Sequence, residues 1–228
     1  MNDFDVARIR ARMPALASGV AFFDGPGGTQ LPDVVADAMR TAMTEPLSNR
    51  GTMTQSELNA ESIVLGSRLA AADLLGCDPA GVVFSRSMTE ATFMVARTLA
   101  KDWGPGDRVV VTDLDHDANV RPWVTYAEKA GAEVAWARLD PTTGELPTCH
   151  IVDQITDNTR LVAVTGASNV VGTRPDLPAI AEAAHAVNAL FYVDGVHLTA
   201  HAPIDVEKIG ADFYACSAYK FLGPHLGI

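Results

Sequence analysis

The stretch that decides the fold spans residues 191–220 and reads FYVDGVHLTAHAPIDVEKIGADFYACSAYK. It begins as an apolar run that stops at a carboxylate, Asp194. It ends with a second apolar run, residues 212–217, and Lys220 comes just after that run. Short apolar runs bounded by turn residues are typical of buried strands. The stretch therefore predicts two neighbouring strands, one ending in an acid and the other followed by a lysine.

An acid and a lysine placed in this way can act together on one ligand. The acid can hold a protonated ring nitrogen, and the lysine can hold an aldehyde as a Schiff base. Pyridoxal phosphate requires both of these groups from its protein. Taken alone, Asp194 would be an ordinary N-cap and Lys220 a solvated surface residue. Tyr219 and Phe221, on either side of the lysine, favour a less exposed setting.

Upstream of this stretch, the chain alternates between expected strands and expected helices. The strands cover residues 82–84, 108–112, 133–138, 161–165 and 190–193, and the helices cover residues 89–100, 119–130 and 177–187. This alternation predicts an α/β fold with three layers, α/β/α, around a mostly parallel sheet. Right-handed crossovers bring the carboxyl ends of the strands to one edge of the sheet, where ligands bind.

The N-terminal part of the chain has a different pattern. The first dozen residues predict an amphipathic helix that Pro14 stops, so residues 1–20 are expected to form a helical segment ahead of a large domain over residues 21–228. Further expected elements are a short strand at residues 21–23 and helices at residues 32–43 and 55–75. Gly76 directly follows the last of these helices and is its expected C-cap.

Composition and charge disfavour several classes of protein. Hydrophobic residues make up 48% of the 228-residue chain, which is typical of a globular protein. The formal net charge of −11 disfavours nucleic-acid binding, because that requires clustered Lys and Arg. No signal segment and no run near the roughly 18 apolar residues of a membrane span are visible, so a cytoplasmic protein without a membrane partner is expected. The 3 cysteines form no CxxC pair, and no complete set of metal ligands is evident.

Polar side chains follow several of the expected strands. Ser87 and Thr89 open a helix, where they would form either an anion site or an ordinary N-cap. His116 is a stacking or acid–base group, or else an exposed loop residue. Asn169 binds a ligand oxygen or stabilises a turn. Each residue is ambiguous alone, but their occurrence at successive strand ends favours a shared ligand site.

Several segments, in order, resemble the class V aminotransferase family of pyridoxal phosphate enzymes (fold type I), in its cysteine desulfurase-like branch. They are FFDGPGGTQLP (22–32), FSRSMTEATFMVA (84–96), DLDHDANVRPW (113–123), VTGASNVVGT (164–173) and VDGVHLTAHAPIDVEKIGADFYACSAYKFLGP (193–224). The resemblance runs from Phe22 to the end of the chain. It implies the large domain of a transferase or lyase that acts on an amino acid, by desulfurase, aminotransferase or epimerase chemistry.

The resemblance also implies roles for individual residues. Lys220 would form the aldimine with the cofactor and later transfer a proton, and His116 would stack on the cofactor ring. Asp194 would pair with the ring nitrogen. The other cofactor-binding positions would be Asn169 and His197 at the phenolic oxygen, and Ser87, Met88, Thr89, Ser217 and Tyr219 at the phosphate. A homodimer is implied, in which Gly27, Gly28 and Arg50 would belong to loops near the substrate or the partner subunit.

The chain departs from the family pattern in a few places. Met88 replaces the usual hydroxyl residue, and Tyr219 replaces the histidine that commonly precedes the lysine. In the family, the chain continues into a small C-terminal domain that holds the substrate carboxylate and, in desulfurases, supplies a nucleophilic cysteine. That domain is expected to be absent here, and Cys77, Cys149 and Cys216 do not match the cysteine.

Two other hypotheses stay open at this point. One is a truncated, catalytically inactive paralogue or partner-binding subunit on the same scaffold, and the early end of the chain favours it. The other is a doubly wound nucleotide-binding domain. The lack of GxGxxG and GxxxxGK[ST] motifs at a strand-to-helix turn counts against that domain.

Overall fold

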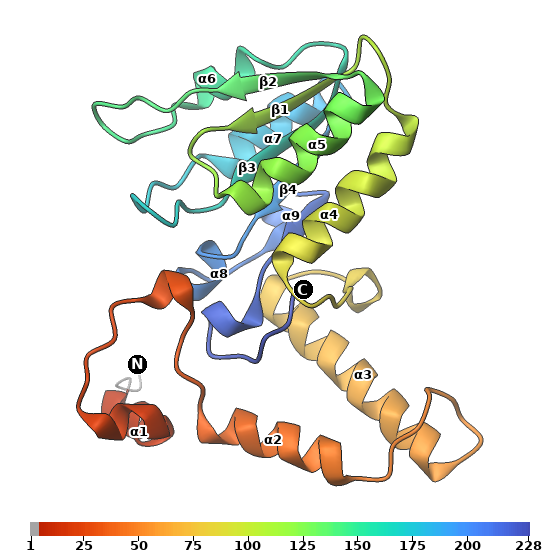
Figure 1. Ribbon diagram of the computed structural model, residues 1–228, viewed down its shortest axis with the longest axis vertical. Coiled ribbons are helices and arrows are strands. Elements are labelled where there is room, and N and C mark those ends of the chain that lie inside the picture. Colours follow the sequence, from red (N-terminus) through yellow and green to blue (C-terminus); the bar gives the residue numbers. More distant parts are fainter. Residues whose placement is uncertain (1–4) are drawn as a thin grey trace.

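A five-stranded parallel sheet forms the centre of the computed structural model, which describes residues 5–228 (Figure 1). The strands are β1 (Arg108–Thr112), β2 (Glu133–Ala137), β3 (Thr159–Thr165), β4 (Leu190–Asp194) and β5 (Phe213–Ala215). Their order is β2-β1-β3-β4-β5, and every neighbouring pair is parallel. The strand order reverses between β1 and β3, which is where open sheets of this kind bind ligands.

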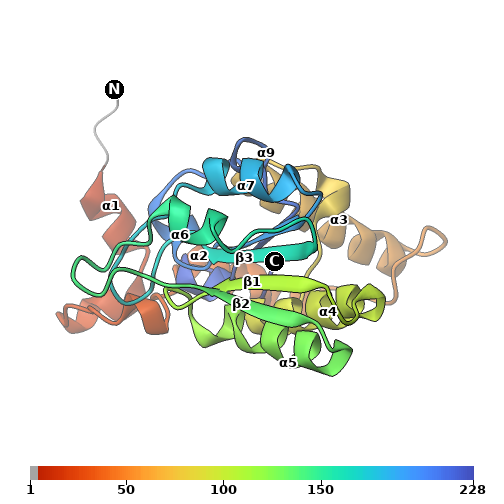
Figure 2. The ribbon, with the colours of Figure 1, turned by 90° about the horizontal axis from the view of Figure 1, so that it is seen from above.

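Helices cover both faces of the sheet, so the predicted three-layer α/β/α fold is confirmed. Figure 2 shows α4 (Met88–Leu99) and α5 (Arg121–Ala130) on one side, with α6 (Thr148–Val152), α7 (Leu177–His185) and α9 (Val206–Ile209) on the other. Val109 and Val111 share a core with Trp123 of α5, whereas Val110 shares a core with Ile180 of α7. This division follows from the two-residue side-chain period of a strand. Apolar side chains on both faces also explain the continuous apolar runs in the sequence.

Glycines end two helices, one of them at the predicted C-cap. The helix α3 (Gln55–Leu75) begins at a capping box of Thr54 and Glu57 and ends at Gly76, whose φ is 64°. Helix α5 ends at Gly131, whose φ is 76°. Glycine adopts this left-handed conformation at little steric cost, so these helix ends are encoded locally.

The N-terminal helices extend away from the sheet (Figure 1). They begin with α1 (Val6–Ala11) and a 3-10 turn (Pro14–Ser18), and α2 (Asp33–Thr44) follows. Residues 1–4 of the predicted first helix lie outside the described residues. Helix α3 packs through its last turn, and its apolar side chains are exposed at Leu58, Ile63, Leu65, Leu69 and Leu74. None of the helices within residues 5–228 is both long enough and apolar enough to cross a membrane.

Two predicted strands do not form. Residues 82–84 are followed by a single isolated bridge, between Ser85 and Gly227. Gly227 also bridges Ser217, so it lies between Ser85 and the end of β5 and keeps them apart. Residues 21–23 pair with no described strand, and Phe23 is 93% exposed. An apolar run becomes a strand only where a partner accepts its backbone hydrogen bonds.

A buried hydroxyl pair joins the sheet to α4. Tyr192 of β4 places its hydroxyl 2.8 Å from Thr92 Oγ1, and Thr92 donates its own proton to Met88 O. We therefore expect Tyr192→Phe to lower the free energy of unfolding by about 1 kcal/mol in urea denaturation. Tyr126→Phe on α5 is the matched control, because the Tyr126 hydroxyl bonds to no described residue. Equal losses in the two variants would contradict the role of this pair.

Candidate active site

The carboxyl ends of β3 and β4 and the loops after β1 and β5 line one cavity. All of the predicted cofactor-binding residues except Ser87 line it, namely Met88, Thr89, His116, Asn169, Asp194, His197, Ser217, Tyr219 and Lys220. Pro26, from the glycine-rich loop near the N-terminus, completes one wall. Parallel pairing explains the convergence, because Thr165, Asp194 and Ala215 are register partners at the same edge of the sheet.

Asp194 is a buried carboxylate at the end of β4, with 4% of its surface exposed. Its Oδ1 accepts a hydrogen bond from Val196 N at 2.9 Å, and no bond to Oδ2 occurs within residues 5–228. Burial raises the pKa of Asp194 to about 6, whereas the nearby positive charge of Lys220 acts to lower it. A buried carboxylate with an unused oxygen beside a cavity is suited to receive an N–H group from a cation.

Lys220 ends a 3-10 turn, Ala218–Lys220, directly after β5. Its Nζ donates to Pro26 O and lies 4.9 Å from the centre of the Tyr219 ring. Burial lowers the pKa of Lys220, although Asp194 acts to raise it. An amine with a lowered pKa has a larger neutral fraction at pH 7, and the neutral form is the nucleophile that attacks a carbonyl.

The N-terminus of α4 faces the same cavity. Ser87 caps this helix by accepting a hydrogen bond from Glu90 N at 3.2 Å, and it does not line the cavity. Met88 donates its backbone N–H to Ser217 Oγ at 3.0 Å, and its side chain is buried in the core. Thr89 lines the cavity at the second helical position, where the N–H has no partner in the helix. An anion can bind at such a helix N-terminus.

His116 begins the 3-10 turn Asp117–Asn119 after β1. Its Nδ1 accepts a hydrogen bond from Ala118 N at 3.1 Å, so in the neutral ring Nε2 carries the proton. His197 lines the same cavity, and burial and the positive charges of Lys220, His201 and His116 lower its pKa. His197 is therefore a neutral ring at pH 7, and it can donate or accept a hydrogen bond.

A buried polar network supports the loop of His116, and it was not predicted. Asp115 accepts hydrogen bonds from Thr112 Oγ1 and from Asn119 Nδ2, the latter at 2.7 Å. Asn119 Oδ1 accepts in turn from Trp123 Nε1 at 3.0 Å. Burial raises the pKa of Asp115 to about 8, and the neighbouring charge of Asp194 adds to the rise. The segment DLDHDAN could have indicated this network, because in it a polar run follows a buried strand.

The other predicted positions lie outside this cavity. Arg50 forms a two-point ion pair with Glu61, with both N–O distances at 2.7 Å. Gly28 contacts the Tyr219 ring, since a Cβ built on it would lie 3.3 Å from Tyr219 Cδ2. Gly27 belongs to the 3-10 turn Gly25–Gly27 that precedes Gly28.

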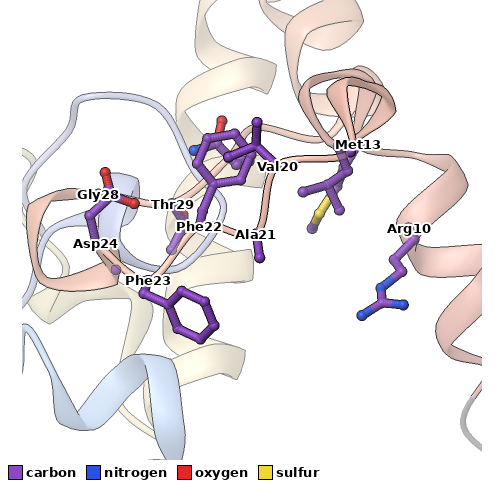
Figure 3. A pocket seen from close by; sticks show the side chains of 13 residues that line it. Arg10, Met13, Val20, Ala21, Phe22, Phe23, Asp24, Gly28 and Thr29 are labelled. Atoms are coloured by element: carbon purple, nitrogen blue, oxygen red, sulfur yellow. The ribbon is translucent and has the colours of Figure 1, made fainter.

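A larger hollow of about 600 Å³ also borders the glycine-rich loop, and Figure 3 shows the residues that line it. Its charged residues are Arg10 and Asp24, and the rest of its lining is mostly apolar side chains and glycine. Thr29 borders this hollow. None of the predicted cofactor-binding residues lines it, so the smaller cavity around Lys220 is the better candidate for chemistry.

Comparison with known proteins bears directly on this arrangement. The family model described as Aminotransferase class-V matches residues 21–228. The chain belongs to the aminotransferase class V family. The resemblance found in the sequence is thereby confirmed.

Similar members of this family include cysteine desulfurases. The chain is 34% identical to cysteine desulfurase CsdA of Escherichia coli over 98% of its own length, and 35% identical to an uncharacterized protein of Mycobacterium tuberculosis over the same share. It covers 56% of each of these relatives, so the chain spans about half of their length.

Solved structures agree with the sequence comparison. A crystal structure of the Escherichia coli CsdA superposes with a TM-score of 0.88 at 30% identity, over 99% of this chain and 57% of that one. An apo cysteine desulfurase from Thermococcus onnurineus gives a TM-score of 0.89 at 28% identity, and the match covers 97% of this chain and 56% of that one. The cavity around Lys220 therefore lies in a fold shared with cysteine desulfurases.

The raised pKa of Asp115 predicts a pH dependence of stability. The pKa of Asp115 is about 8 in the folded protein and about 4 in the unfolded chain. Between pH 4 and pH 8, the folded state therefore binds more protons at this group than the unfolded state does. Stability is therefore lost as pH rises from 4 to 8, with a slope of up to about 1.4 kcal/mol per pH unit from this group. In urea denaturation at pH 5, 6.5 and 8, Asp115→Asn should remove much of the slope seen in the parent. Asp117→Asn, an exposed carboxylate in the same loop, should keep it, and the same slope in all three proteins would contradict the role of Asp115.

Proposed function

We propose that this chain is the cofactor-binding large domain of a pyridoxal phosphate enzyme that acts on an amino acid, with Lys220 as the covalent anchor of the cofactor. The observation that carries the proposal is the convergence of Lys220, Asp194 and His116 on one cavity at the carboxyl edge of the sheet. These residues come from three separate segments, namely the end of β4 and the turns after β1 and β5, and the family match supports the same proposal.

The residues that line the cavity match the functional groups of this cofactor, beginning with its ring nitrogen. Asp194 has a free oxygen and would hold the ring nitrogen in its protonated form. When bound, pyridoxal phosphate supplies an electron sink for the pair released at Cα of the amino acid. Asp194 is already buried and hydrogen-bonded to Val196 N, so it is oriented before any ligand arrives.

The phosphate end of the cofactor fits the N-terminus of α4. Thr89 would donate its N–H and its hydroxyl, and Ser217 would donate the hydroxyl that now accepts from Met88 N. The Met88 N–H is already used in this bond, so we assign the phosphate to Thr89 and Ser217 and leave Met88 and Ser87 in supporting roles. The Tyr219 hydroxyl is a further candidate donor to the phosphate, in place of the family's histidine.

The faces and edge of the ring would be held by three other side chains. His116 would stack on the ring, with the Asp115 network keeping its loop in place. Asn169 and His197 would hydrogen-bond the phenolic oxygen, and a neutral His197 can donate there without adding charge. Once the substrate amine replaces it, Lys220 would be free to move a proton at Cα.

The chain's own thiols do not reach this site. Cys77, Cys149 and Cys216 are absent from the cavity lining, and burial raises the pKa of Cys216 to about 12. Desulfurase, aminotransferase and epimerase chemistry share the groups described above. Among them we favour carbon–sulfur chemistry on a small amino acid, because several relatives carry the name cysteine desulfurase.

We also propose a cytoplasmic homodimer. The support is the family match, together with the apolar residues that α2 and α3 leave exposed, such as Met43 and Leu69. Large contiguous apolar surface marks contact sites. Gly27, Gly28 and Arg50 would then lie close to the substrate or to the second subunit.

The covalent anchor has a direct test. Incubation with pyridoxal phosphate followed by borohydride reduction should attach the cofactor to Lys220, as read by mass spectrometry of the digested protein. We expect Lys220→Ala to lose this label completely. Lys208→Ala, an exposed lysine paired with Asp205, should keep it. Undiminished labelling of Lys220→Ala would refute the assignment, and a parent chain that binds no cofactor would favour a non-catalytic scaffold.

Asp194 predicts a pH dependence of cofactor binding. Its pKa of about 6 in the free protein means that the carboxyl is ionised above pH 6 and protonated below it. At pH values below 6, the affinity of the parent for pyridoxal phosphate should therefore decrease, whereas the affinity of Asp194→Asn should not show this decrease. At pH 8 the variant should bind about tenfold more weakly or worse, because a hydrogen bond to a charged group contributes about 1.5–3 kcal/mol. Fluorescence titration measures both effects, and parallel pH profiles would contradict the role.

A further inference from the structure

The turn that carries Lys220 is held by a loop from the opposite end of the chain. Thr29 donates its backbone N–H to Tyr219 O at 2.8 Å and its hydroxyl to the same oxygen at 3.1 Å. Its Oγ1 also accepts from Leu222 N at 2.7 Å. One side chain therefore fastens the backbone just before Lys220 and just after it. Figure 1 shows this N-terminal loop beside the C-terminal turns.

The hydroxyl of Thr29 is well suited to fix this geometry. It has a single proton, which goes to Tyr219 O, and it accepts the N–H of Leu222 on a lone pair. The hydroxyl is thus engaged both as a donor and as an acceptor, and the two bonds together fix its orientation. Serine can make the same two bonds, whereas valine has the same branched shape and can make neither.

The backbone after Lys220 needs such support. Leu222 has a φ of 71°, in the left-handed region that side chains with a Cβ disfavour. A residue keeps this conformation only where surrounding contacts hold it. Two contacts do so here, the bond from Leu222 N to Thr29 Oγ1 and the bond from Gly223 N to Ala218 O at 2.8 Å.

The same loop also reaches the side chains of the lysine turn. Pro26 O accepts a hydrogen bond from Lys220 Nζ. Gly28, with a φ of 147°, lies against the Tyr219 ring, and that ring stacks on His225 with centroids 4.5 Å apart. The glycine-rich loop therefore contacts both the backbone and the amine of the lysine turn.

We infer that Thr29 is a positioning residue for Lys220. Its hydroxyl sets the backbone on both sides of the lysine, so that Nζ is presented at the cavity wall between Pro26 and Asp194. The inference rests on the proposed function, because the position of Nζ matters for chemistry only if Lys220 is the anchor. It goes beyond that function by assigning a role to a residue that does not line the cavity.

The test compares Thr29→Val with Thr29→Ser in the full chain. The control is Thr98→Val, which removes an exposed hydroxyl that donates to Met94 O within α4. Without cofactor, amide hydrogen exchange at Leu222 should quicken at least tenfold in Thr29→Val and stay near the parent rate in Thr29→Ser and Thr98→Val. With pyridoxal phosphate added, the rate of borohydride-trapped labelling of Lys220 should fall at least tenfold in Thr29→Val and recover in Thr29→Ser.

The outcomes separate this inference from the proposed function. Exchange at Leu222 and labelling of Lys220 that match the Thr98→Val control would overturn the role of Thr29. A parent that takes up no cofactor would refute the proposed function, and exchange at Leu222 would still decide whether Thr29 holds the turn. Circular dichroism reports whether Thr29→Val is folded. If it is not, Thr29→Ala takes its place, with the same expected loss of protection at Leu222.

Discussion

The burial of Asp194 is the constraint on which the rest of the site depends. Moving a carboxylate out of water is costly unless a partner compensates for the lost solvation. The fold supplies one backbone N–H, from Val196, and a lysine near enough to act on its charge. The remaining oxygen lies at a cavity edge that β3, β4 and β5 create together by ending in register. A cationic ligand that donates a hydrogen bond to that oxygen would compensate for the rest of the lost solvation.

Asp115 adds a second, partly buried acid to the same region. The negative charge of Asp194 adds to the effect of burial in raising the pKa of Asp115, since a second negative charge in a poorly solvated place disfavours ionisation. The network through Asn119 and Trp123 ties Asp115 to α5 and so anchors the loop of His116 to the core. The cavity therefore combines rigid acids with an amine on a separately held turn. Such a set favours a ligand that bears both a cationic nitrogen and a carbonyl.

The lysine turn joins the two ends of the chain. Ala218 and Cys216 pair with the final residues of the chain, and Tyr219 pairs with Thr29 from the N-terminal loop. Lys220 is thus positioned from several sides, although its own helical turn is only a few residues long. Short turns have little stability of their own, so the precision of such a site comes from the contacts around it. This explains how a strained residue such as Leu222 can be kept beside the reactive amine.

The sequence by itself determined most of the sheet and several helix ends, and it singled out residues that the fold brings to one cavity. Apolar runs located β1 and β4, and Gly76 and Gly131 marked helix ends, because strand burial and helix capping depend on neighbours in sequence. Only the tertiary structure decided that residues 82–84 stay unpaired, that Asp115 lies near Asp194, and that Thr29 holds the turn of Lys220. These features depend on partners far apart in sequence, such as Leu222 and Thr29, which are 193 residues apart. Pairing at that range is set by how the whole core packs, and local patterns carry no record of it.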